Sequence, residues 1–239
     1  MEAKTRAYNY LDGVSRIRDI LNQSDVSYEE VKELPSRDDL TFSNGFYSYA
    51  TALFIDIRKS SELPDKHKRP VLARLYRAFV SEMVAVLTSH SRVREVNIVG
   101  DCVWAIYNTP NKVDVDEAFS IAAKAFSMVK ILNKELAKRD ITTIKVGLGL
   151  EYGRALMIKA GYSGSGINDV VYMGDVVNKA AKLASQGNKE LFDNALMVGN
   201  TLYGNLKDEN KKLLAKSSYG CYEGTVVNTA IEKWTNENY

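Results

Sequence analysis

Apolar residues in this chain alternate between helical spacing and strand-like spacing along most of its length. Steps of three and four residues predict amphipathic helices over residues 6–22, 67–89, 114–138, 175–185 and 206–216. Runs rich in β-branched and aromatic residues predict strands over 46–57, 92–99, 102–107, 142–150 and 154–159. Turns are expected at Gly100-Asp101, at Glu151-Tyr152-Gly153, and at Glu223-Gly224 in a last hairpin over 219–234.

Local signals refine the ends of these elements. Tyr10, Val14, Ile17 and Leu21 form one face of the first helix. Residues 23–45 are polar, contain Pro35 and a Ser43-Asn44-Gly45 turn, and are predicted to form a connector. Asp114, with Glu117 three residues later, is typical of a capped helix start.

The order of the central elements is β-α-β-β-α-β, which predicts an α+β fold of the ferredoxin-like type with added helices and C-terminal strands. At 239 residues the chain is long enough for one full domain and a small extension. We therefore divide it into an N-terminal helical extension and connector, residues 1–45, and a main domain, residues 46–239.

Two aspartates carry the clearest chemical signal. Asp56 lies at the end of one strand, and Asp101 lies in the turn of the following hairpin. The predicted fold places these strands side by side, so the two carboxylates are expected to lie close together. Mg²⁺ binds through one or two carboxylates plus substrate phosphates. The pair therefore indicates metal-dependent chemistry on a nucleotide, although a single aspartate at a strand end is more often a turn former.

Two further segments fit a phosphate-bearing substrate. Ser60 and Ser61 follow Asp56 in a loop whose N–H groups could hold a triphosphate. Asn178 and Lys182 are four residues apart and share one helix face, where an amide and a cation could bind a phosphate oxygen. A plain turn and a solvated helix face are the alternatives.

Composition limits the possible partners. The net charge of +2, from 32 basic and 30 acidic residues, shows no basic excess for nucleic acid. No apolar run suits a membrane span or a secretory signal, and the two cysteines do not suggest a disulfide framework. We expect a reduced protein of the cytoplasm that binds neither nucleic acid nor membrane.

The motifs together resemble the catalytic domain of class III nucleotidyl cyclases. The first metal motif of that family is matched by Phe54-Ile55-Asp56-Ile57 with Ser60-Ser61, and its Gly-Asp hairpin by Gly100-Asp101. Its asparagine helix is matched by Gly174-Asp175, Val177-Asn178 and Ala180. The resemblance covers roughly residues 48–200.

Departures from the family pattern concern the base and the transition state. The family's arginine is Lys182 here, which keeps the charge but lacks the planar fork of donors. The two base-reading positions hold Asn97 and Val171, which match neither the adenine nor the guanine pattern. Asn97 could pair with a pyrimidine edge, and Tyr49 is our choice for a residue that stacks on a small base.

A short cyclase without either purine pattern is similar to the bacterial pyrimidine cyclases of Pycsar anti-phage defence. The resemblance implies conversion of UTP to cyclic UMP, a second messenger read by a separate effector, with CTP as the alternative substrate. It implies two Mn²⁺ or Mg²⁺ ions at Asp56, Asp101 and the Ile57 carbonyl. It also implies a homodimer in which Asn178 and Lys182 come from the partner chain.

Three other hypotheses stay open from the residues alone. They are a purine cyclase with an unusual base pocket, an inactive cyclase-like domain that binds nucleotide, and the palm domain of a polymerase or diguanylate cyclase. The glycine-rich segment 161–166 before the asparagine helix fits the last of these poorly.

Overall fold

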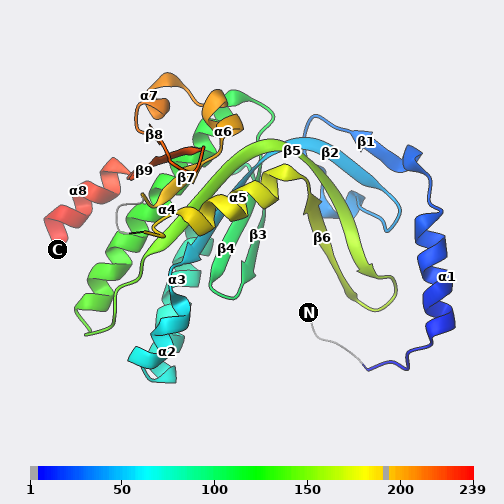
Figure 1. Cartoon of the computed structure of the whole chain (residues 1–239), viewed down its shortest axis with the longest axis horizontal. Coiled ribbons are helices and arrows are strands. Elements are labelled where there is room, and N and C mark those ends of the chain that lie inside the picture. Colours follow the sequence, from blue (N-terminus) through cyan, green and yellow to red (C-terminus); the bar gives the residue numbers. More distant parts are fainter. Residues whose placement is uncertain (1–4, 191–193) are drawn as a thin grey trace.

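A computed structural model describes residues 5–190 and 194–239 and shows one central sheet with helices on both faces (Figure 1). The predicted core is confirmed. It runs through β2 (Gly45–Ile57), α3 (Arg69–Leu87), β3 (Val93–Val99), β4 (Cys102–Asn108), α4 (Lys112–Ala137) and β5 (Val146–Tyr162). These four strands lie in the order β3-β4-β2-β5, and their pairings are antiparallel. This is the ferredoxin-like arrangement.

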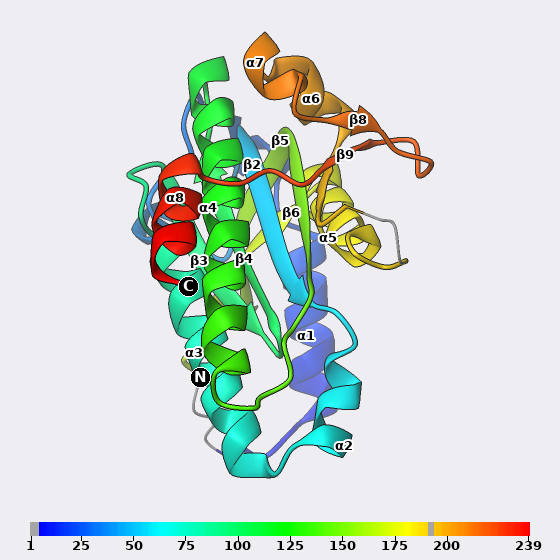
Figure 2. The same ribbon diagram turned by 90° about the vertical axis from the view of Figure 1, so that its left-hand side faces the viewer.

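Alternation along β2 determines which face each residue occupies, because successive side chains of a strand point to opposite faces. Leu53, Ile55 and Ile57 are buried in the large core beneath α3 and α4. Ala50 and Ala52 point the other way, into a second cluster that includes Val176 and Ala180 of α5 (Asp175–Gln186). Figure 2 shows α3 and α4 on one side of the sheet and α5 on the other.

The contact between α5 and β5 depends on small residues. A Cβ at Gly149 would lie 2.0 Å from the carbonyl oxygen of Ala180, and one at Gly147 would lie 2.1 Å from that of Ala184. No side chain fits at such distances. The glycines therefore let the helix backbone lie directly on the strand.

The predicted turn at Glu151-Tyr152-Gly153 is wrong, because β5 continues through it. Pairing with β2 runs without a break from Val146 to Ile158. The buried Glu151 carboxylate accepts the N–H of Tyr152 at 2.9 Å and that of Leu202 at 3.0 Å. The polar residue that suggested a turn thus supports α6 (Asn200–Asn205) from within a strand.

Residues 161–166 are the tip of a long hairpin rather than a loop leading directly into a helix. Strand β6 (Ile167–Met173) pairs with the end of β5, from Leu156↔Met173 to Tyr162↔Ile167. The hairpin projects from the sheet in Figure 1, and α5 begins only after it.

The C-terminal elements also differ from the prediction. The remaining elements there are β7 (Leu196–Val198), α7 (Asp208–Lys211), β8 (Ala215–Lys216), β9 (Tyr222–Gly224) and α8 (Thr229–Asn238). The predicted hairpin over 219–234 is wrong, because its expected turn, Glu223-Gly224, lies within β9 and α8 stands in place of its second strand. Asn228 caps α8 by accepting the N–H of Ile231 at 3.1 Å, and the helix lies along α4, where Lys130 pairs with Glu232. The predicted helix over 206–216 is reduced to α7, and a short helix, α2 (Leu63–Lys66), was not predicted.

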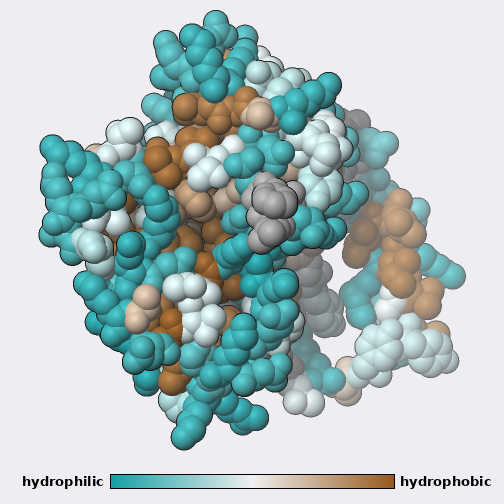
Figure 3. Space-filling view, turned by 60° about the vertical axis from the view of Figure 1, so that its left-hand side comes forward, coloured by the Kyte–Doolittle hydropathy of each residue, from teal (hydrophilic) through white to brown (hydrophobic). Residues whose placement is uncertain are grey.

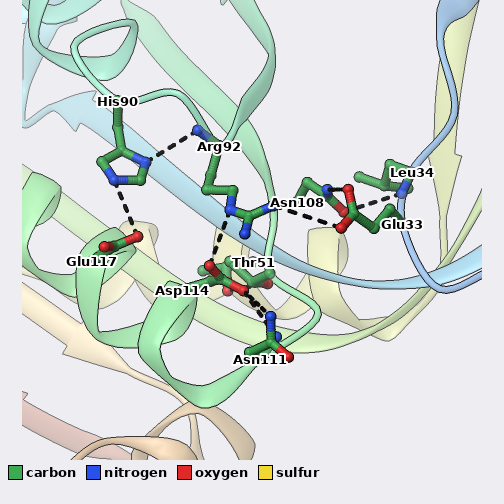
Figure 4. A network of polar contacts seen from close by, with 10 residues as sticks. Glu33, Leu34, Thr51, His90, Arg92, Asn108, Asn111, Asp114 and Glu117 are labelled. Carbon is green, nitrogen blue, oxygen red and sulfur yellow. Dashed lines mark hydrogen bonds and ion pairs between the residues drawn. The ribbon is translucent and has the colours of Figure 1, made fainter.

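The N-terminal connector is bound to the main body of the chain. Strand β1 (Tyr28–Glu30) pairs in parallel with the start of β2. Leu34 is buried, and its N–H donates to Asn108 Oδ1 at 3.0 Å, while Asn108 Nδ2 donates to Glu33 at 3.0 Å. Figure 4 shows this network reaching the start of α4. The division of the chain at residue 45 stays a prediction.

The same network corrects the predicted cap of α4. The N-cap is Asn111, whose N–H donates to Asp114 Oδ2 at 2.9 Å, and Asp114 is the third helical residue. Asp114 also pairs with Arg92 at 3.0 Å, whereas Glu117 pairs with His90 at 3.1 Å. The helix therefore begins two residues earlier than its charge pattern suggested.

The predicted N-terminal helix is α1 (Tyr10–Leu21), and its apolar residues are not covered by its own chain. Tyr10 is 68% exposed, Ile17 59% and Leu21 78%.

On another side of the molecule, Figure 3 shows apolar surface among hydrophilic residues. A hollow of about 510 Å³ lies between α3 and α4. Among the residues that the structure describes, no helix combines the length and apolar character that a membrane span requires.

We expect Gly149→Ala to destabilise the fold by about 1–3 kcal/mol, because an added methyl group must push α5 off β5. Urea unfolding followed by circular dichroism measures the change. Gly204→Ala in α6 is the control, since its Cβ would meet nothing within 4 Å. Equal stability of the two variants would contradict the close contact.

Candidate active site

The structure brings Asp56 and Asp101 to the same end of the sheet. Asp56 pairs with Cys102 across β2 and β4, and Asp101 is the neighbour of Cys102 in the turn. Gly100 opens this turn with a φ of 62°, a conformation that glycine adopts without strain. The hairpin therefore holds Asp101 one residue from the position opposite Asp56.

The electrostatics of this end agree with two adjacent carboxylates. Burial raises the pKa of Asp56, Arg58 lowers it, and the charge of Asp101 raises it. Burial, together with the charges of Asp56 and Asp101, raises the pKa of Cys102 to about 12, so its thiol stays protonated at neutral pH. Negative charge is thus concentrated where a cation could be bound.

Sequence reasoning overlooked Arg58. Its side chain is only 14% exposed, and its guanidinium forms an ion pair with Asp56. A second nitrogen, Nη1, donates to the carbonyl oxygen of Ser185 in α5 at 3.0 Å. A basic residue two positions after a candidate metal ligand was visible in the sequence, but its contact with residue 185 required the tertiary structure.

A basic cavity of about 590 Å³ opens beside Arg58. Its cationic lining residues are Arg58, Lys59, Lys66, Lys145 and Lys189, and Glu62 and Glu190 are the acidic ones. The Arg58 N–H donates to the carbonyl oxygen of Lys145 at 2.8 Å, which fixes these two segments together. Ser60 and Ser61 lie in the short turn that follows Lys59. This excess of positive charge suits a polyanion such as a triphosphate.

Asn97 lies on the same face of the sheet as Asp56, two pairing rows away. It is opposite Trp104 of β4, which in turn is opposite Phe54 of β2. The rings of Phe54 and Trp104 stack with centroids 4.9 Å apart and planes 1° from parallel. The half-buried Asn97 amide therefore lies at the edge of an aromatic surface.

The polar residues beside Asn97 form a buried cluster that sequence reasoning did not identify. Glu95 is two residues before Asn97, accepts the hydroxyl of Tyr172 at 3.1 Å and pairs with Arg37 at 3.2 Å. Burial raises the pKa of Glu95, whereas Arg37 lowers it. Tyr172, not its neighbour Val171, is the residue of β6 that reaches β3.

Within one chain the structure does not bring Tyr49 or Val171 to this site. Tyr49 is an odd number of residues from Asp56 on an unbroken strand, so it points to the opposite face, about 23 Å away at the usual rise. It stacks on Tyr152 with ring centroids 5.6 Å apart. Val171 is 39% exposed on β6, opposite Ile158.

Asn178 and Lys182 share one face of α5, as expected, and that face points away from the sheet. Val176, Ala180 and Ala184 are buried against the strands, whereas Asn178 and Lys182 are exposed. Neither side chain makes a hydrogen bond or ion pair within the described residues. Asp56 lies on the face of the sheet that α5 covers. Within one chain, Asn178 and Lys182 therefore point away from Asp56.

Comparison with known proteins identifies the family. The model of the adenylate and guanylate cyclase catalytic domain matches residues 44–223. The chain belongs to this family. Two curated relatives named uridylate cyclase are each 40% identical to this chain. The alignment with the relative from Treponema porcinum covers 96% of this chain and 82% of the relative. The alignment with the relative from Gulbenkiania mobilis covers 100% of each. The chain is thus a nucleotidyl cyclase.

Solved structures agree with the fold. The adenylyl cyclase CyaB from P. aeruginosa has a TM-score of 0.60 at 21% identity, covering 72% of this chain and 85% of that one. A class III adenylyl cyclase-like ATP-binding protein from Pseudomonas aeruginosa has a TM-score of 0.72 at 18% identity, covering 95% of this chain and 50% of that one. At these identities the likeness concerns the fold alone.

The residues of this cyclase fit a divalent ion. Asp56 and Asp101 provide adjacent carboxylates, and Ile57 is the last residue of β2 beside them. Within the described ranges, no group of three or more His, Cys, Asp or Glu residues is arranged to hold a metal. Mg²⁺ does not require one, because substrate phosphates and water complete its coordination.

We expect Asp56→Asn to raise the melting temperature of the cyclase without nucleotide or metal at pH 8. The pKa of Asp56 is raised in the folded state, so its charged form destabilises the fold above that pKa. The difference in melting temperature between the variant and wild type should shrink as the pH falls through the pKa of Asp56 in the folded state, because the wild-type carboxyl then becomes protonated.

Thermal melts at several pH values measure the difference. Asp208→Asn is the control, because the Asp208 carboxylate is 91% exposed on α7. A variant no more stable than wild type at pH 8 would contradict the proposed burial cost.

Proposed function

We propose that this cyclase converts UTP to 3′,5′-cyclic UMP and pyrophosphate by attack of the ribose 3′-hydroxyl on the α-phosphate. Near-complete coverage of two relatives named uridylate cyclase carries the proposal. The aligned region spans 96% of this chain for one relative and 100% for the other, so with the second it includes the base-reading segments as well as the metal motifs. Cytidylate cyclase activity on CTP is the alternative.

The geometry beside Asn97 supports a small base. An amide offers both a donor and an acceptor, as the Watson–Crick edges of uracil and cytosine require. The Phe54–Trp104 stack lies in the same pairing row, so two large rings occupy space on the face where the base would bind. Both features favour a pyrimidine over a purine.

Asp56 and Asp101, with the Ile57 carbonyl, are the proposed ligands of two Mn²⁺ or Mg²⁺ ions. When bound, the ions would lower the pKa of the 3′-hydroxyl and neutralise the triphosphate. Lys59, Lys145 and the turn at Ser60 and Ser61 would hold the phosphate chain in the basic cavity. Arg58 lies between these two regions.

A homodimer with shared active sites would explain why Asn178 and Lys182 point away from Asp56 and Asp101 within one chain. Asn178 and Lys182 of one copy would reach the Asp56 and Asp101 of the other, with Lys182 at the transition-state position. The exposed apolar residues of α1 also favour contact with another chain, because several large apolar side chains are exposed on this one helix.

The biological role is a further proposal. The resemblance supports production of cyclic UMP in the cytoplasm as an anti-phage signal that a separate effector reads. Neither nucleic acid nor membrane is required by the proposed reaction.

Purified protein with each nucleoside triphosphate and Mn²⁺ is expected to form cyclic UMP from UTP, identified by mass spectrometry. Asp56→Asn and Asp101→Asn should each lower the rate at least about a hundredfold, since even residues that only support metal ligands contribute up to that factor. Asp208→Asn should retain full activity.

The products discriminate the hypotheses. Cyclic CMP as the main product would indicate the alternative substrate, and cyclic AMP alone would contradict the pyrimidine assignment. No product from any nucleotide would favour the inactive, nucleotide-binding alternative.

Mixing two inactive variants tests the shared sites. Asp56→Asn and Asn178→Ala should each be inactive alone. After mixing and exchange of subunits, about half of the dimers contain one chain of each kind, and each such dimer has one intact site. We expect about a quarter of wild-type activity, and no recovery would contradict shared sites.

A further inference from the structure

Arg58 makes contacts with two parts of the chain that the proposed dimer would use in different active sites. Its guanidinium pairs with the Asp56 carboxylate, and Nη1 donates to the carbonyl oxygen of Ser185 at 3.0 Å. Asp56 belongs to the metal end of the sheet, and Ser185 belongs to α5, which carries Asn178 and Lys182. One buried side chain therefore connects the two halves.

The connection reaches the phosphate-binding face of α5 through one further contact. The Ser185 hydroxyl donates to the carbonyl oxygen of Lys182 at 2.6 Å. Arg58 itself is anchored at its backbone, where its N–H donates to the Lys145 carbonyl at 2.8 Å. Its Nε is buried without a hydrogen-bond partner among the described residues. Arg58 is thus held at its backbone N–H and at the two terminal nitrogens of its guanidinium, but not at Nε.

A divalent ion at Asp56 would compete with this arrangement. The ion requires carboxylate oxygens at short range, and Arg58 already occupies one of them. Two positive groups on one carboxylate also repel each other. Movement of the guanidinium away from Asp56 would remove its bond to Ser185, because both bonds depend on the same planar group.

We propose that Arg58 is a positioning residue that couples the end of β2 to α5. It joins Asp56 to Ser185 at the C-terminal end of α5, and a divalent ion bound at Asp56 releases both of these contacts. In the proposed dimer, ion binding in one site would then alter the helix that serves the other site. The inference rests on the proposed role of Asp56 as a metal ligand.

The test measures Mn²⁺ binding to the full-length protein without nucleotide, by electron paramagnetic resonance of free Mn²⁺ at pH 8. Arg58→Met should bind Mn²⁺ about tenfold more tightly than wild type. This is the size expected for loss of a unit positive charge about 6 Å from a divalent ion in a water-like medium. Arg77→Met is the matched control, because Arg77 is exposed on α3 and makes no ion pair within the described residues.

Hydrogen exchange of α5 tests the coupling itself. In wild type, Mn²⁺ should raise the exchange rate of the amides over 182–186 several-fold. In Arg58→Met these amides should exchange quickly with or without Mn²⁺. Arg58→Lys keeps the charge but lacks the fork that makes both contacts, so it should show fast exchange without tighter Mn²⁺ binding; it also serves if Arg58→Met does not fold.

The outcomes separate the two proposals. If Asp56→Asn binds Mn²⁺ as tightly as wild type, Asp56 is not a metal ligand and the proposed function itself fails. If Asp56→Asn loses Mn²⁺ binding but Arg58→Met binds no more tightly than wild type, or α5 exchange does not respond to Mn²⁺, only the coupling by Arg58 is overturned.

Discussion

The pairing of β2 with a strand on each side is the constraint on which the rest of the structure depends. All thirteen residues of β2 pair with β5, and seven of them also pair with β4. With both edges bonded, the strand cannot shift by one residue without exchanging its two faces. This register buries Leu53 and Ile55 under α3 and α4, and it leaves Asp56 on the face of α5.

Close packing of α5 on β5 then divides the candidate site. Glycines in the strand and alanines in the helix bring the two backbones together, so the face opposite Ala180 must point outward. Asn178 and Lys182 lie on that outward face, and the carboxylates lie on the inward side. Close packing thus separates Asn178 and Lys182 from the two carboxylates within one chain, and this separation is the physical basis for the proposed dimer.

At the end of β2, the ionised Asp56 carboxylate destabilises the fold, and a catalytic site can use such an unfavourable charge to bind a ligand. Burial and the neighbouring Asp101 both raise the pKa of Asp56, so its charge is held at the expense of stability. The ion pair with Arg58 offsets part of that cost. Sites that bind charged ligands commonly keep such unfavourable groups, because the ligand returns the lost energy when it binds.

The sequence by itself determined the local features: the strand ending at Asp56, the hairpin at Gly100-Asp101 and the helix carrying Asn178. These depend on alternation, turn residues and helical spacing between near neighbours. The sequence also implies that Tyr49 and Asp56 occupy opposite faces, since they are an odd number of residues apart on one strand, although we chose Tyr49 as the residue that stacks on the base. Only the tertiary structure decided that β5 continues through Glu151, that Arg58 bonds both Asp56 and Ser185, and that α1 is left uncovered. Those outcomes depend on which distant segments pack together, and no local pattern specifies that choice.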